Sequence, residues 1–98
     1  MTLDTFILGY LRSHGAVLPD ELRDAAAAAG HDARGRYELV SGRQTVIPFI
    51  SQAFAEALLR LRDGRQLRLC ATSQSDYLAF NPWRAIGVNL CPVRLEAV

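Results

Sequence analysis

The stretch of residues 46–62, VIPFISQAFAEALLRLR, constrains the fold most, because its apolar residues recur at spacings of three and four. That period gathers them on one face of an α-helix, and such a face needs a core to pack against. The residues of this face are Ile47, Ile50, Ala53, Phe54, Ala57, Leu58 and Leu61. We expect Thr45 to cap the helix, Pro48 to lie in its first turn, and Asp63 with Gly64 to end it.

Length and composition indicate one globular domain. The chain has 98 residues, of which 50% are hydrophobic and 21% charged, and it contains no low-complexity run. No apolar run approaches the roughly 18 to 20 residues of a membrane span, and the N-terminus does not resemble a signal peptide, so we expect a cytoplasmic protein. All 11 basic residues are arginine and the net charge is only +1, which disfavours a strongly nucleic-acid-driven surface. The arginine and alanine bias is typical of a high-GC bacterial or phage gene.

Two shorter helices are expected before this stretch. The apolar spacing after Thr2 predicts a helix that this threonine caps and that ends near Gly15. Pro19, followed directly by two carboxylates, opens a second helix that Gly30 closes. Residues 31–44 are polar and contain glycine, so they predict a loop that holds at most a short strand.

Two strands are expected after the long helix. Residues 67–71 alternate in the manner of a half-buried strand, and residues 77–80 form a second one across a polar turn. The expected fold class is therefore α+β, with three helices followed by an antiparallel β-hairpin and an extra C-terminal strand. We divide the chain into a domain of residues 1–80 and an extension of residues 81–98, which packs as an edge strand or binds a partner.

This order of elements resembles a winged helix-turn-helix domain. The resemblance rests on FILGYLRSHGAVLPDELRDAAAAAG, ISQAFAEALLRLRDGRQLRL and YLAF, and it covers residues 3–80. Two features depart from the common pattern, namely the long insert of residues 31–44 and the tail of residues 83–98.

The resemblance implies a DNA-binding role for the helix that starts at Val46, with the loop of residues 72–76 as the wing. It implies contacts to DNA bases from Arg43, Gln44, Ser51 and Gln52. It implies phosphate contacts from Arg60, Arg62, Arg65 and Arg68. The arginines at the end of the helix would also suit its dipole. The expected function is thus a non-catalytic transcription regulator whose partner is double-stranded DNA.

An alternative interpretation is a protein-interaction module, such as an adaptor or inhibitor. Asp76 in the expected wing and Phe49 at the front of the expected helix suit DNA poorly. The tail also carries more apolar surface than a terminal strand needs, at Trp83, Ile86, Val88 and Leu90. Such an edge strand either captures a protein partner or a second copy to form a homodimer, or folds back on the hairpin as a third strand.

No catalytic or metal-binding motif occurs in the sequence. The GxSxG, P-loop and HExxH patterns are missing, and His14 and His31 fall at expected turns. Cys70 and Cys91 lie far apart and form no CxxC pair, which argues against a metal site. We therefore expect no enzyme activity, no metal and no small-molecule cofactor.

Overall fold

The described residues of the computed structural model, 1–41, 44–70, 79–81 and 93–98, form three helices and five strands. The helices are α1 (Leu3–His14), α2 (Pro19–Ala28) and α3 (Gln52–Asp63). The strands are β1 (Arg34–Ser41), β2 (Gln44–Ile50), β3 (Leu67–Cys70), β4 (Ala79–Asn81) and β5 (Arg94–Ala97). The predicted α+β class, with three helices, an antiparallel hairpin and a further C-terminal strand, is confirmed.

The first two helices begin and end where their capping residues predict. The Thr2 hydroxyl accepts a hydrogen bond from the Thr5 amide at 3.2 Å, which satisfies a free donor of the first turn of α1. Gly15 has the left-handed φ of 76° and donates its N–H to the Leu11 carbonyl, so α1 stops there. Pro19 occupies the first position of α2, where the missing N–H removes no bond.

The long predicted helix is wrong in its first part. β2 covers the beginning of that stretch, and α3 starts only after Ser51, whose hydroxyl accepts from the Phe54 amide. Thr45, Val46 and Ile47 are β-branched and all buried, so they suit a strand that is covered on both faces. Such a strand shows no alternation of apolar and polar residues. By chance, its apolar residues continue the spacing of the helix that follows it in the sequence. Thr45 is therefore a buried strand residue and does not cap a helix.

The pairing of the strands also differs from the prediction. β1 and β2 form an antiparallel hairpin between α2 and α3, in the segment predicted to be mostly loop. β4 pairs with the other edge of β1, and β3 pairs with β5, so β3 and β4 do not form the predicted hairpin with each other. The prediction joined the nearest strands in sequence because it recognised no long strand in β1 that could give β4 a partner.

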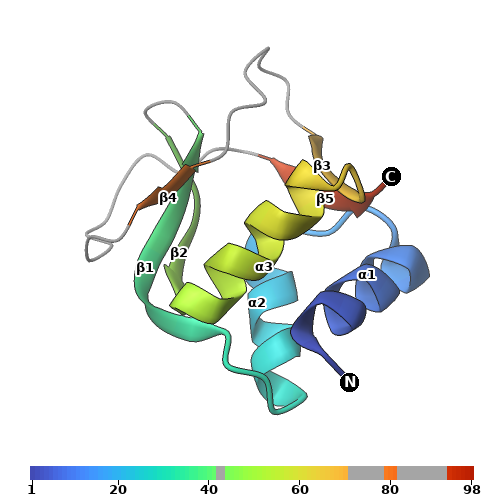
Figure 1. Cartoon of the computed structure of the whole chain (residues 1–98), viewed down its shortest axis with the longest axis horizontal. Helices are drawn as coiled ribbons and strands as arrows, with labels where there is room; N and C mark the ends of the chain where they lie inside the picture. Colours follow the sequence, from blue (N-terminus) through green and yellow to red (C-terminus); the bar gives the residue numbers. More distant parts are fainter. Residues whose placement is uncertain (42–43, 71–78, 82–92) are drawn as a thin grey trace.

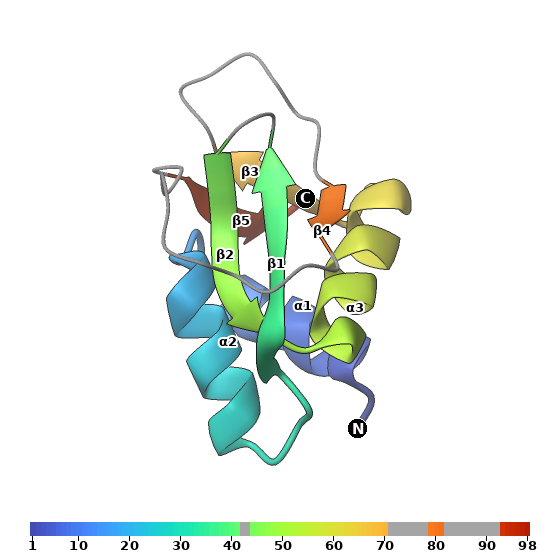
Figure 2. The ribbon, with the colours of Figure 1, turned by 90° about the vertical axis from the view of Figure 1, so that its left-hand side faces the viewer.

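All three helices lie on one side of the sheet β2-β1-β4 (Figures 1 and 2). The largest fully buried side chains come from every helix and most strands, and include Phe54, Ile7, Leu11, Leu22, Leu39, Ile47 and Leu95. Burial of one such side chain contributes about 1.5–3 kcal/mol. Val93 and Leu95, from the end of the chain, belong to this core, and Leu95 bridges to Val17. The division at residue 80 stays a prediction.

The outer edge of β2 is closed by α2, which lies beside it (Figure 2). Pro48 has no N–H to offer at this edge, and its carbonyl accepts a hydrogen bond from the Arg23 guanidinium at 2.7 Å. Phe49 follows with a left-handed φ of 56°, and the residue is 54% exposed. The Pro48 carbonyl is therefore already occupied, and Pro48 supplies no amide donor to a further strand.

The junction of β2 and α3 is closely packed against the start of β1. Ser51 donates its amide to the Ala33 carbonyl at 2.7 Å and its hydroxyl to the Asp32 carbonyl at 2.9 Å. A side chain at Gly35 would place its Cβ 2.6 Å from the Ile50 carbonyl oxygen, closer than van der Waals contact allows. The absence of a side chain at Gly35 thus permits β1 to approach this junction.

We predict that Gly35→Ala destabilises the protein by about 1–3 kcal/mol, because backbone atoms must move to admit the methyl group. Gly9→Ala is the matched control, since Gly9 lies inside α1 and, apart from its chain neighbours and its own helix backbone, nothing lies within 4 Å of the added Cβ. The control should stabilise the protein by about 0.5–1 kcal/mol through helix propensity. Urea unfolding of the two variants and the parent measures both changes. Equal effects of the two substitutions would contradict the described packing.

Candidate functional site

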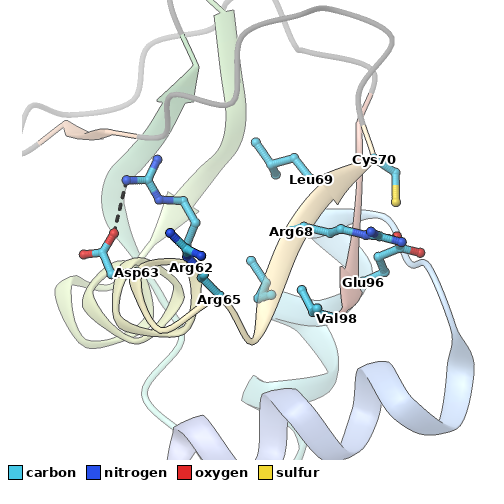
Figure 3. A pocket seen from close by; sticks show the side chains of 9 residues that line it. Arg62, Asp63, Arg65, Arg68, Leu69, Cys70, Glu96 and Val98 are labelled. Atoms are coloured by element: carbon cyan, nitrogen blue, oxygen red, sulfur yellow. Dashed lines mark hydrogen bonds and ion pairs between the residues drawn. The ribbon is translucent and has the colours of Figure 1, made fainter.

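A groove of about 740 Å³ lies where the end of α3 meets β3 and β5 (Figure 3). The residues that line it combine three arginines, two carboxylates and a set of apolar side chains. They are Arg62, Asp63, Arg65, Leu67, Arg68, Leu69, Cys70, Glu96 and Val98. We call this the arginine groove.

The turn after α3 places Arg65 at the arginine groove in an unusual backbone conformation. The Gln66 amide bonds to the Leu61 carbonyl at 2.8 Å, and the Arg65 amide bonds to the Arg62 carbonyl at 2.9 Å. This pair of bonds is a Schellman motif, whose left-handed position usually holds glycine. Here that position holds Arg65, with φ of 58°, while Gly64 has an ordinary φ of −78°. A left-handed residue with a side chain costs roughly 1–2 kcal/mol.

Two of the three arginines are paired with carboxylates, whereas Arg65 is exposed. Arg62 contacts Asp63 at 3.1 Å, and Arg68 contacts Glu96 across the β3–β5 ladder. Within the described part of the chain, no carboxylate pairs with Arg65. The arginine groove therefore presents one uncompensated cation beside two ion pairs.

The pair of Arg68 and Glu96 sets the protonation behaviour of the arginine groove. The hydrogen bond from Arg68 lowers the pKa of the Glu96 carboxyl, and a second bond from Cys70 adds to this shift. Burial raises the pKa of the Cys70 thiol, and its hydrogen bond to Glu96 raises it further. At neutral pH the thiol is therefore protonated and donates to a carboxylate, which does not favour a reactive thiolate.

The residues expected to read DNA bases do not form one exposed surface. Ser51 is buried as the cap of α3, and Gln44 is the exposed first residue of β2. Gln52 is exposed, but its side-chain amide donates to the Glu56 carboxylate at 2.9 Å on the same helix. Arg43 lies outside the described residues.

The residues expected to contact phosphate are divided between two places. Arg60 makes a two-point contact with Asp4 of α1, and the shorter of its distances is 2.8 Å. Its hydrogen bond to Asp4 raises the pKa of Arg60 and ties the side chain to α1. Arg62, Arg65 and Arg68 line the arginine groove. The structure thus brings together three of the four arginines that were predicted to contact phosphate.

The predicted partner-binding residues of the tail, Trp83, Ile86, Val88 and Leu90, lie outside the described residues, as does the expected wing of residues 72–76. Three residues that line the arginine groove were not predicted from the sequence, namely Glu96, Leu67 and Leu69. Alternation over residues 67–71 correctly predicted the strand β3. This alternation does not indicate which edge of the strand lacks a neighbouring strand.

Comparison with known proteins yields no relative, since no protein-family model, curated protein or solved structure matches the chain. Among the described residues, no group of three or more His, Cys, Asp or Glu side chains could hold a metal ion. None of the described helices has the length and hydrophobicity needed to cross a membrane.

We predict that Arg68→Met raises the pKa of Glu96 toward its ordinary value of 4.5, because the strongest contact with the carboxylate is lost. In the parent the folded-state pKa is the lower one. The pair therefore stabilises the fold above the unfolded-state pKa of Glu96, and this contribution disappears as the pH falls through the folded-state pKa. NMR titration of the Glu96 carboxyl carbon measures the shift.

The matched control is Arg94→Met, which removes an arginine from the neighbouring strand without removing a hydrogen bond to Glu96. Its titration should stay close to that of the parent. A Glu96 pKa that does not respond to Arg68→Met would show that the ion pair does not persist in solution.

Proposed function

We propose that the chain is a non-catalytic protein-interaction domain whose arginine groove binds an acidic segment of a partner protein. The observation that carries the proposal is Arg65. It is exposed in a left-handed position where glycine would be more stable. Strained residues of this kind cluster at functional sites, because the contact made by the side chain outweighs the cost in stability.

The chemistry of the arginine groove suits a protein segment. Arg62, Arg65 and Arg68 favour carboxylates, while the half-buried Leu69 adds apolar surface beside them. Protein interfaces combine apolar contact with arginine in this way. Planar guanidinium groups also match the two oxygens of a carboxylate.

The DNA-binding interpretation has less support. Of the four arginines expected to contact phosphate, Arg60 lies outside the arginine groove and makes a two-point contact with Asp4. The start of α3 continues directly from the hairpin through the buried Ser51. Short turns join the two helices of a helix-turn-helix, whereas α2 and α3 are separated by β1 and β2. We therefore retain DNA binding as the alternative that the experiment below tests.

The proposal keeps three expectations from the sequence, namely the absence of catalysis, the absence of a cofactor and a cytoplasmic location. None of them is needed for the arginine groove to bind an acidic segment.

We predict opposite effects of Arg65→Gly on stability and binding. Glycine relieves the left-handed strain, so the free energy of unfolding should rise by about 0.5–1 kcal/mol. Loss of the guanidinium should weaken binding of a fluorescent peptide of alternating glutamate and valine roughly 2- to 5-fold, as expected for an exposed ion pair. Arg65→Glu should weaken binding further through repulsion. Urea unfolding and fluorescence anisotropy measure the two effects.

Arg36→Glu is the control for the change in net charge, because Arg36 is exposed on β1 and does not line the arginine groove. It should bind the peptide like the parent. The same anisotropy measurement with random duplex DNA, at low and near-physiological salt, tests the alternative. Salt-sensitive DNA binding without peptide binding would replace the proposed function by the alternative.

A further inference from the structure

The strand β3 is an edge of its sheet, and β5 lies in the interior. On one side β5 pairs with β3. On its other side Leu95 exchanges both of its backbone hydrogen bonds with Val17, at 2.9 and 2.8 Å. In the described part of the chain, β5 thus has two neighbours and β3 has one.

The alternation of hydrogen bonds along the β3–β5 ladder identifies which backbone groups of β3 have no partner in β5. In an antiparallel ladder, the backbone groups of successive residues point alternately toward the partner strand and away from it. Leu95 directs its groups to Val17, so its ladder partner Leu69 must direct its own groups away from β5. Leu67 lies two residues from Leu69, so its backbone groups also point away from β5. The hydrogen bond from the Val98 amide to the Gln66 carbonyl, at 3.1 Å, fits this alternation, because Gln66 precedes Leu67 and directs its carbonyl toward the β5 side.

The arginine groove follows this open edge. Leu67 and Leu69 belong to one face of β3, and Arg68 and Cys70 belong to the other. Figure 3 shows Leu69 and Arg68 on opposite sides of the strand, although both line the same groove. A hollow lined from both faces of a strand borders its edge. The backbone donor and acceptor of the half-buried Leu69 therefore face the groove, whereas Leu67 is only 2% exposed and belongs to the core.

We infer that an extended acidic segment of a partner protein adds to the edge of β3 as a new strand. The backbone N–H and C=O of the half-buried Leu69 would bond to one residue of the segment, as in other cases of strand addition. Its carboxylates would lie near Arg65 and Arg62 at one end of the strand and near Arg68 on its outer face. This inference rests on the proposed function and specifies how the acidic segment binds to the arginine groove.

Charge distinguishes an acidic partner from a second copy of the chain. Antiparallel pairing of β3 with its own copy around a two-fold axis would bring the two Arg68 side chains close together, with both Arg65 side chains nearby. Like charges across a strand pair are destabilising, and charged side chains at an edge are a known protection against self-association. An acidic strand meets no such repulsion.

Backbone methylation of the peptide tests the inference directly. Two versions of the alternating glutamate and valine peptide carry N-methyl groups on one or the other set of alternate amides. Only one set faces β3, so one version should bind at least about tenfold more weakly than the unmodified peptide and the other should bind nearly as well. Both versions keep all side chains and charges, so each is the control for the other.

Hydrogen exchange of the protein amides gives a second measurement. Binding of the unmodified peptide should slow exchange of the Leu69 amide, which faces the groove. Exchange of the Arg68 amide, which faces β5, should change much less.

Equal effects of the two methylated peptides, together with unchanged exchange at Leu69, would overturn strand addition while the proposed function stands. Absence of binding by the unmodified peptide at about 1 mM, the weak end of the affinity scale, would overturn both.

Discussion

The turn at Ser51 is the constraint on which the arrangement of the helices and the main sheet depends. Its hydroxyl caps α3, and its hydroxyl and amide both bond to the segment that leads into β1. A single residue thereby sets the angle between the hairpin and α3, and Gly35 lets β1 pass close beside it. Because α3 carries Phe54 and Leu58 into the core, the position of this turn also determines where its last residues reach β3.

Local signals in the sequence predicted the elements that depend on local chemistry. Thr2 and Pro19 correctly indicated the starts of α1 and α2, and alternation correctly indicated β3. Prediction failed at residues 46–50, because β2 is buried on both faces at residues 45–47 and its apolar residues have the same spacing as the helix that follows. It failed again in pairing β3 with β4, since partners in a sheet are chosen by the shared core and not by proximity in sequence.

The arginine groove was only partly predictable. Arg62, Arg65 and Arg68 were identified as contacts to phosphate, and the structure gathers them for a different geometric reason, the meeting of the end of α3 with β3. The sequence Asp63, Gly64, Arg65 suggests that glycine takes the left-handed position, yet Arg65 takes it. The free edge of β3 depends on the bridge between Val17 and Leu95, two residues far apart in the chain.

That bridge has a consequence for the stoichiometry of any complex formed through this sheet. Since Val17 occupies the far side of β5, the described strands of the sheet β3–β5 leave one open side, that of β3. Under the inferred strand addition, a partner strand would fill the open side, and the described strands of this sheet would offer no second edge to a third chain. Such an association would be self-limiting and would end in a finite one-to-one complex, because an open-ended fibre needs two free edges.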